Sequence, residues 1–237
     1  MPAHRRRTNR KNSESVDNYL KAILSLGGPE ERRVASTALA EQLGVAPASV
    51  TNMLQKLAGA PEPLVEYERH RGVKLSAAGK RRALEVVRHH RLIETFLYKI
   101  LDYPIEEVHE EAERLEHFIS ERFEERIAAK LGHPTIDPHG HSIPTMEGEM
   151  PRQASMLLSD AVEGGTFLID SVSDRDARTL RLLEANGIKA GAKLHVRPQV
   201  EGDPGEYSVS VGRSAKAVAL TAEAAGDIRI VPLLVTN

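Results

Sequence analysis

The stretch ALAEQLGVAPASVTNMLQKL, residues 38–57, decides the fold of the N-terminal part of the chain. Its first half has apolar residues at helical spacing and stops at Gly44, and Pro47 then opens a second segment with the same spacing. Two short helices joined by a tight turn that contains a glycine form a helix-turn-helix. The sequence therefore predicts a helix-turn-helix motif in this stretch.

The second helix of the motif has a polar side that is suited to DNA. Small residues at its start would allow close approach to the floor of a groove, and the polar residues that follow can bond base edges or phosphates. The residues expected on this side are Ala46, Pro47, Ala48, Ser49, Thr51, Asn52, Gln55 and Lys56. The alternative is a helical hairpin inside a larger bundle, with ordinary solvated polar residues.

The segment LVEYERHRGVKLS, residues 64–76, follows directly and predicts a β-hairpin. Apolar and polar residues alternate on both sides of a turn at Arg71-Gly72. A hairpin directly after a helix-turn-helix is a wing, and Arg69, Arg71 and Lys74 would place positive charge near its tip. The wing favours the DNA-binding interpretation for a domain over residues 13–75.

A run of metal-ligand side chains marks the middle of the chain. In EEVHEEAERLEHFISERF, residues 106–123, we expect one helix from Pro104 to about Leu131. His109, Glu113, Glu116 and His117 would then lie within about 100° of one helix face. His90 and Glu94 are four residues apart on a helix expected from Ser76 to about Leu101. Such faces can bind a divalent metal, although solvated surface residues give the same spacing.

Composition narrows the possible chemistry. The 237 residues are enough for more than one domain, and the net charge of −2 alone does not indicate nucleic acid or membrane as a partner. The chain has no cysteine, so any metal site must use nitrogen and oxygen ligands. No apolar run approaches the ~20 residues of a membrane span. We therefore expect a cytoplasmic protein with no membrane partner.

The remaining segments complete a fold that is mainly α with α+β character. Residues 1–12 are predicted to be a disordered basic arm, and residues 76–150 a helical domain that ends in a linker rich in Pro, Gly and His. In that linker His133, Asp137, His139 and His141 could bind metal, but a polar loop is favoured, and His70 and His89 are expected at the surface. Residues 151–237 contain one helical segment, DARTLRLLEANG, and short alternating runs that predict the strands of a small β-barrel: TFLIDSV (166–172), KLHVRPQV (193–200), EYSVSVG (206–212), AVALT (217–221) and IRIVPLL (228–234).

The motifs together resemble one known family, the diphtheria-toxin-repressor family of metal-dependent transcriptional regulators. The resemblance covers roughly residues 10–150 and continues more weakly as the small Src-homology-like third domain of longer members. It implies a winged-helix DNA-binding domain and a helical domain for dimerisation and metal binding. The stretches that carry it are DNYLKAILSL, ALAEQLGVAPASVTNMLQKL, YERHRGVKLSAAGK, RHHRLIETFL, VHEEAERLEH and HPTIDPHGHSIP.

The resemblance also implies two metal sites per subunit. The ancillary site matches His90, Glu94 and His109, completed by polar groups of the third domain, where Ser171 and Asp174 are the nearest positions. The primary site matches Glu113, Glu116 and His117, with one further ligand from the first helix. That last position falls on Asn18.

Asn18 departs from the family pattern that the resemblance implies. At this position the manganese-responsive members look like having an aspartate, and the iron-responsive members a methionine. Asn18 still offers a carbonyl oxygen, a hard neutral donor. On a regular helix Asp17 points about 100° away from Asn18, so Asp17 could bind the ion only if the helix shifts. The third alternative is that the primary site has one ligand fewer. Glu113 stands where iron-type members have a cysteine. An all-nitrogen-and-oxygen site favours Mn²⁺, with Fe²⁺ as the alternative.

The implied function is a dimeric regulator that binds a palindromic double-stranded DNA operator when loaded with metal and controls genes of metal uptake and homeostasis. We do not expect an enzyme. Two other classes remain open: a helical-bundle dimetal enzyme, for which the chain lacks two Glu-x-x-His pairs, and a winged-helix regulator gated by an organic ligand. The second predicts no change in melting temperature on addition of Mn²⁺.

Overall fold

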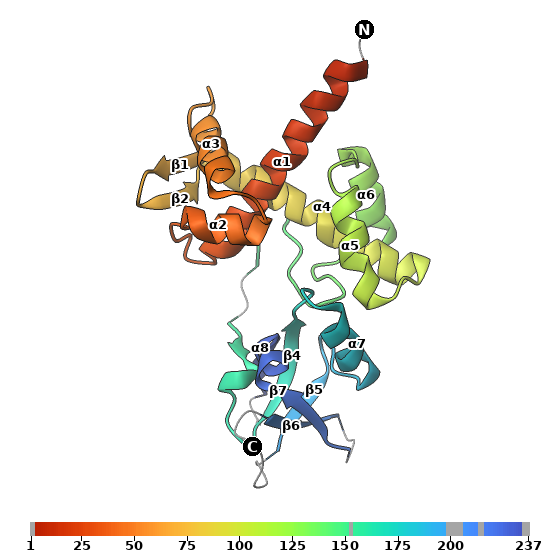
Figure 1. The fold of residues 1–237 in the computed structure, drawn as a ribbon. Helices are drawn as coiled ribbons and strands as arrows, with labels where there is room; N and C mark the ends of the chain where they lie inside the picture. The colour runs from red at the N-terminus through yellow and green to blue at the C-terminus, as the bar shows by residue number, and fades with distance from the viewer. Residues whose placement is uncertain (1–2, 152–153, 198–205, 213–215, 234–237) are drawn as a thin grey trace. The chain divides into compact units, whose positions relative to one another are not determined.

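The computed structural model describes residues 3–151, 154–197, 206–212 and 216–233, with the side chains described from residue 13 onward. The chain forms two compact units, which we describe separately (Figure 1). The first unit contains Met1–His90, Glu116–Ile119 and Pro144–Met150. The second contains Arg91–Leu115, Ser120–Ile143 and Pro151–Asn237.

The first unit is a winged helix. Helix α1 (Ala3–Gly27) packs against α2 (Ser36–Leu43), and α2 packs against α3 (Pro47–Ala58). Gly44 between α2 and α3 has φ 62°, the left-handed conformation that ends a helix at low cost in glycine. Leu20, Leu39, Val50 and Leu54 form the centre of the core and are fully buried. The predicted helix-turn-helix is therefore present, with the predicted bounds.

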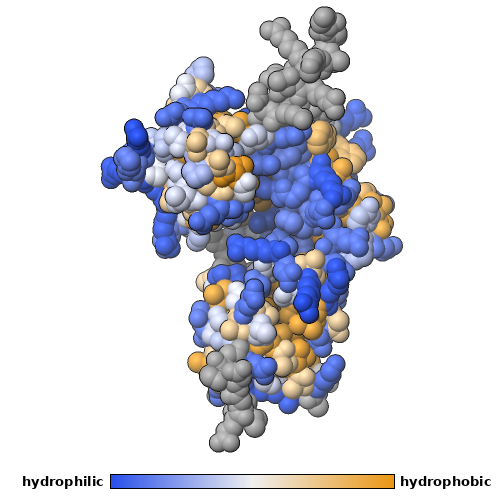
Figure 2. Space-filling view, viewed as in Figure 1, coloured by the Kyte–Doolittle hydropathy of each residue, from blue (hydrophilic) through white to orange (hydrophobic). Residues whose placement is uncertain are grey.

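The predicted wing is also present. Strand β1 (Val65–Glu68) pairs antiparallel with β2 (Gly72–Leu75), and Arg69, His70 and Arg71 form the turn. The side chains over this end of the hairpin are hydrophilic, at the left of Figure 2. Helix α4 (Ala77–Leu101) begins directly after β2. A Cβ atom on Gly79 would lie 1.9 Å from the carbonyl oxygen of Leu64, so only glycine lets α4 start this close to the chain before β1.

The N-terminal segment differs from the prediction of a disordered arm over residues 1–12. Helix α1 begins at Ala3 and so includes most of the segment that was predicted to be the arm. The segment from residue 3 to residue 12 contains no glycine or proline and is rich in arginine, a good helix former, so nothing in it stops the helix. The basic side chains of this segment lie outside the described side chains.

The helix expected from Pro104 to Leu131 is broken, which corrects the prediction of four ligands on one helix face. Helix α5 (Ile105–Leu115) ends before Glu116, and residues 116–118 form a turn. A new helix, α6 (Glu121–Lys130), begins because the Ser120 hydroxyl accepts a hydrogen bond from the Phe123 amide. His109 and Glu113 therefore lie on α5, whereas Glu116 and His117 lie in the turn.

The second unit combines helices with a β domain. Leu92 of α4, Ile127 and Ala128 of α6, and Ile143 form a small apolar core. The β domain has a six-stranded sheet with strand order β3-β8-β4-β5-β6-β7. Its elements are β3 (Met156–Leu157), the 3-10 turn η1 (Leu158–Asp160), β4 (Thr166–Val172), α7 (Ala177–Ala185), β5 (Lys193–Val196), β6 (Glu206–Val211), β7 (Val218–Thr221), α8 (Ala222–Gly226) and β8 (Ile228–Pro232).

The predicted strands of the β domain and its main helix, α7, are confirmed, and η1 and α8 are additional. The closed barrel is not confirmed, because β3 and β7 lie at the two edges of the sheet and, among the described residues, do not pair with each other. The predicted strand segments at 198–200 and 234 lie outside the described residues. Among the helices of the described chain, none has both the length and the apolar character that crossing a membrane requires.

Candidate metal centres

The first candidate centre lies within the first unit and joins α1 to the turn after α5. Asn18 Oδ1 is 2.9 Å from His117 Nε2, and Glu116 Oε1 is 3.3 Å from the same nitrogen. Oxygen and nitrogen ligands that surround one octahedral ion at about 2.1 Å are about 3 Å from one another. His117 Nε2 therefore lies from each of the two oxygens at the spacing expected between ligands of one ion.

The structure distinguishes between Asn18 and its neighbour Asp17. Asp17 forms an ion pair with Arg82 at 2.7 Å and lies 3.6 Å from His117 Nδ1, the ring nitrogen opposite to the one that faces Asn18. Burial would raise the pKa of Asp17, but the nearby His117 ring and the Arg82 guanidinium outweigh this and lower it. Asp17 is thus an ionised group placed to orient the His117 ring, as outer carboxylates commonly do at metal-ligating histidines.

Glu116 is the most enclosed group of the first centre. Its side chain has no exposed area, and its carboxylate contacts Lys21 Nζ at 2.8 Å and His90 Nδ1 at 2.6 Å. Burial would raise the pKa of Glu116, but the hydrogen bond to His90 and the charge of Lys21 outweigh this and lower it. Glu116 is therefore held as a carboxylate, the form that binds a cation.

The second candidate centre lies within the second unit. His109 Nδ1 on α5 is 3.3 Å from Glu94 Oε1 on α4 and 3.3 Å from Asp174 Oδ2, which follows β4. Hydrogen bonds to Asp174 and Glu94 raise the pKa of His109 to about 10. The same hydrogen bond lowers the pKa of Asp174 although burial opposes it. The structure thus joins three residues of the predicted ancillary set.

His139 lies beside the second centre, although the sequence favoured a polar loop over a metal ligand at this position. Its side chain is fully buried and its Nδ1 lies 3.8 Å from Glu94 Oε1. Among the residues that the structure describes, neither ring nitrogen has a hydrogen-bond partner, which is costly for a buried polar group. Glu94, His139 and Asp174 each offer a ligand atom within 4.8 Å of the others. A cation bound there would satisfy His139, so the residues fit a metal ion.

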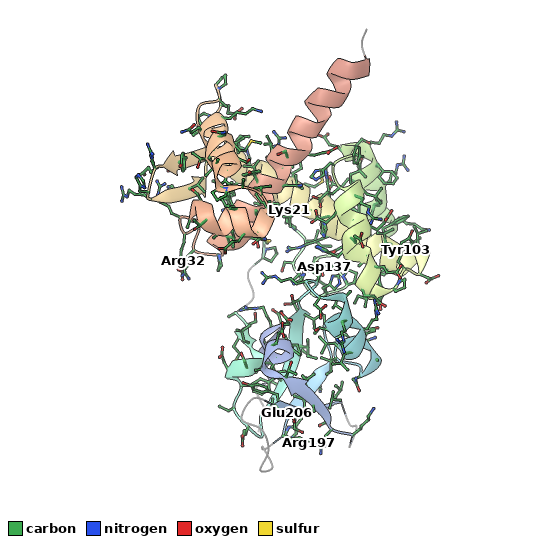
Figure 3. The ribbon with its side chains drawn as sticks, viewed as in Figure 1. Lys21, Arg32, Tyr103, Asp137, Arg197 and Glu206 are labelled. Atoms are coloured by element: carbon green, nitrogen blue, oxygen red, sulfur yellow. The ribbon has the colours of Figure 1, made fainter. Side chains whose placement is uncertain are left out.

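The loop around His139 is built for this position. Asp137 Oδ1 accepts hydrogen bonds from the backbone amides of His139 and His141, both at 2.9 Å, and the His139 carbonyl accepts one from the Val172 amide of β4 at 2.9 Å. Gly140 has φ 95°, and a Cβ atom there would lie 2.1 Å from the Asp170 carbonyl oxygen. Only glycine permits this close contact between loop and strand. Figure 3 labels Asp137 in this loop.

The other predicted ligands do not all lie with the residues of the site for which they were predicted. Glu113 lies on α5 with its Oε1 3.9 Å from His109 Nε2, in the second unit. His90 contacts Glu116, a residue predicted for the other site. Ser171 is buried in β4. His89 is 8% exposed, so the prediction of a surface residue was wrong, because this side of α4 faces the protein interior; His70 is exposed as predicted.

The predicted DNA-binding side of α3 is open to solvent. Its exposed residues are Ala46, Pro47, Ala48, Ser49, Asn52, Gln55 and Lys56. Thr51 is half-buried, and its hydroxyl donates a hydrogen bond to the Pro47 carbonyl at 3.2 Å. Arg69 and Arg71 of the wing are exposed, and Arg71 pairs with Glu68. The Lys74 side chain pairs with Glu66 at 2.9 Å, away from the tip.

Three family models match the chain in order. Residues 11–73 match the iron dependent repressor N-terminal DNA binding domain, and residues 76–145 match the iron dependent repressor metal binding and dimerisation domain. Residues 156–232 match the FeoA domain. The diphtheria toxin repressor of Corynebacterium efficiens is 32% identical over 77% of this chain and 83% of its own length.

The chain belongs to the diphtheria-toxin-repressor family of metal-dependent transcriptional regulators. A solved structure of this family, a manganese-dependent transcriptional repressor in complex with manganese, is 37% identical, with a TM-score of 0.83 over 92% of this chain and 100% of that one. The iron-dependent repressor IdeR of Mycobacterium leprae is 33% identical, but the match spans only 55% of this chain and 56% of that protein.

Two residues of this family member were missed by the reasoning from sequence. His139 was assigned to a polar loop because its burial comes from long-range packing against β4, which no local pattern reports. Lys21 was not singled out, although it lies three residues after Asn18 and therefore on a neighbouring part of the same helix face. That spacing was the available signal for Lys21, whereas His139 had only its Asp-Pro-His-Gly-His setting.

Proposed function

We propose that this protein is a regulator that binds a palindromic DNA operator as a homodimer when it is loaded with Mn²⁺, with Fe²⁺ as the alternative, and that it controls genes of metal homeostasis in the cytoplasm. The observation that carries the proposal is a winged-helix domain whose α1 supplies Asn18 to the same cluster of donor atoms as Glu116 and His117. A bound ion would supply a cross-link between two segments of the chain.

The first centre would hold its ion through Asn18, Glu116 and His117. Asn18 belongs to the helix that packs on the helix-turn-helix, and Glu116 and His117 belong to the segment matched by the metal binding and dimerisation model. An ion bound by both groups stabilises one placement of α1 against the turn. The winged helix would then be held in the arrangement that fits the operator.

The second centre would hold an ion through Glu94, His109, His139 and Asp174, with His90 as the further ligand implied by the resemblance. The donors come from α4, α5, the loop and the segment after β4. Nitrogen and carboxylate ligands without sulfur suit Mn²⁺ and Fe²⁺, and the manganese complex of the similar repressor supports Mn²⁺. We therefore propose two ions per subunit.

Dimerisation would use apolar side chains that the second unit leaves exposed. Leu101 and Phe123 are 51% and 50% exposed, and Ile100 and Leu115 also have large exposed areas. Exposed apolar residues of this size commonly mark a protein interface. Two subunits would present two α3 helices to successive major grooves, which matches a palindromic operator.

Replacement of Lys56 by alanine is expected to weaken DNA binding at all sequences and to lower the slope of log affinity against log salt by about one, because one phosphate contact is lost. The measurement is fluorescence anisotropy with an operator recovered by selection from random duplexes in Mn²⁺. Lys99→Ala, which removes an exposed lysine at the end of α4, is the control. An unchanged salt slope in Lys56→Ala would remove α3 from the proposed interface.

Replacement of His139 by alanine is expected to lower the number of bound Mn²⁺ ions from about two to about one per chain, because the second centre loses its most buried ligand. Equilibrium dialysis with metal analysis measures this number. His133→Ala is the matched control, since His133 is an exposed histidine in the same loop. Two ions in both variants would exclude His139 from the site.

A further inference from the structure

Lys21 makes a contact that neither centre explains. Its Nζ atom donates hydrogen bonds to both carboxylate oxygens of Glu116, at 2.8 and 2.9 Å. The Lys21 side chain is 20% exposed and that of Glu116 is fully enclosed. Figure 3 labels Lys21 on α1. The same carboxylate supplies Oε1 to the donor cluster around His117 Nε2, so the ammonium group lies beside a proposed metal ligand.

We infer that Lys21 sets the metal affinity of the first centre by competing with the ion for Glu116. This inference rests on the proposed function. The ammonium group neutralises the buried carboxylate, and His90 Nδ1 lies 2.6 Å from Oε2. An ion that binds Glu116 meets the like charge of Lys21, so the ammonium group has to withdraw from at least one oxygen before the ion is held.

The consequence is a threshold for metal. Only the molecules in which Lys21 has left the Glu116 carboxylate can bind the ion. The apparent dissociation constant of the ion therefore rises in inverse proportion to the fraction of such molecules. The ammonium group also keeps the metal-free state stable, since a buried carboxylate without a cation is strongly unfavourable. Lys21 would therefore allow the empty protein to fold while making it respond only above a certain metal concentration.

A purely orienting role for Lys21 makes the opposite prediction. If Lys21 held Glu116 in the correct position for the ion, its removal would weaken metal binding. If the pair contributed only to folding, its removal would lower the melting temperature equally with and without metal. The competing role predicts tighter binding together with a lower melting temperature of the metal-free protein alone.

The test compares the full-length protein with Lys21→Met and Lys21→Gln, of which the second keeps a hydrogen-bond donor without charge. Mn²⁺ binding is measured by isothermal titration, and melting temperature is measured with and without Mn²⁺. We expect one of the two Mn²⁺ dissociation constants to fall about tenfold or more in both variants, and the rise in melting temperature on metal addition to increase. Lys21→Arg, which keeps the charge, should behave like the natural protein.

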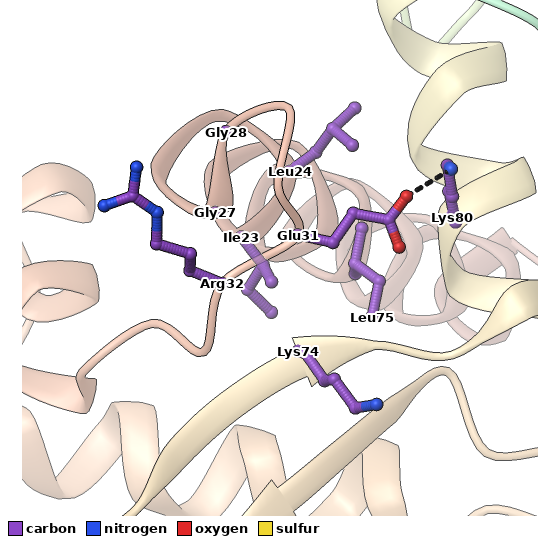
Figure 4. Close-up of a pocket in the computed structure, with 9 residues that line it drawn as sticks. All are labelled: Ile23, Leu24, Gly27, Gly28, Glu31, Arg32, Lys74, Leu75 and Lys80. Atoms are coloured by element: carbon purple, nitrogen blue, oxygen red, sulfur yellow. Dashed lines mark hydrogen bonds and ion pairs between the residues drawn. The ribbon is translucent and has the colours of Figure 1, made fainter.

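Lys80→Gln is the matched control, because Lys80 forms an ion pair with Glu31 at 2.5 Å elsewhere in the same unit (Figure 4). If Lys21→Met and Lys21→Gln bind Mn²⁺ as tightly as the natural protein or more weakly, the competing role of Lys21 is overturned. This holds even if the natural protein binds two ions. If Lys21→Met binds Mn²⁺ and the natural protein does not, the competing role of Lys21 is upheld and the proposed function of the natural sequence is contradicted. If none of these proteins binds Mn²⁺, both the competing role of Lys21 and the proposed function are overturned.

Discussion

Replacement of Glu116 by glutamine is expected to abolish the stimulation of DNA binding by Mn²⁺, which for a linkage of this kind is on the order of 5- to 150-fold. Glu116 contributes the charged oxygen beside His117 Nε2, and a neutral amide holds a divalent ion far less strongly. Glutamine is preferred to alanine here. It keeps the volume of a fully enclosed side chain and a hydrogen-bond acceptor for Lys21.

The measurement is an anisotropy titration of the selected operator with the natural protein and with Glu116→Gln, each with and without Mn²⁺. Glu110→Gln serves as the control, since Glu110 is an exposed carboxylate on α5 that pairs only with nearby Arg114 among the described contacts. Melting curves of both variants establish that they fold. Full stimulation by Mn²⁺ in Glu116→Gln would show that the first centre does not control DNA binding.

Replacement of Gly140 by alanine is expected to lower the free energy of unfolding by about 3 kcal/mol or more and to weaken Mn²⁺ binding at the second centre at least tenfold. A Cβ atom at this position would lie 2.1 Å from the Asp170 carbonyl oxygen and 2.8 Å from the Ala190 side chain. Relief of this overlap has to move the loop from β4, and His139 moves with it. Denaturant unfolding and metal dialysis measure the two effects.

Gly132→Ala is the control that separates the effect of atomic overlap at residue 140 from the effect of backbone strain. Gly132 also has a positive φ, 75°, but a Cβ atom there would meet nothing within 4 Å. Alanine at Gly132 should cost only about 1–2 kcal/mol, the strain of the left-handed conformation, and should leave metal binding unchanged. Equal losses of stability in the two variants would mean that the contact between loop and β4 is unimportant.

The winged helix could be predicted from sequence because its signals are local. Gly44 stops one helix, Pro47 starts the next, and the alternation around Arg71-Gly72 gives the hairpin, so each element is specified within a few residues. The strands of the β domain were found in the same way. Closure of the sheet into a barrel depends on pairing between distant strands, which alternation does not report.

The candidate centres could be predicted only in part. The helical period over residues 105–117 continues without interruption, so the break after Leu115 could be anticipated only from Ser120 as a helix cap. His139 depends on long-range burial, and the pairing of His90 with Glu116 depends on how distant segments pack. By contrast, the choice between Asp17 and Asn18 arose from the sequence, and the contacts of the two residues differ: Arg82 binds Asp17, while Asn18 faces His117.

The most direct test of the central claim is the affinity of the full-length protein for the selected palindromic operator, measured by anisotropy in a chelator and again in Mn²⁺, Fe²⁺ and Zn²⁺. We predict that Mn²⁺ tightens binding at least fivefold, that two subunits bind each palindrome, and that the chelator reverses the effect. Operator affinity that is the same in the chelator and in every metal would contradict the account.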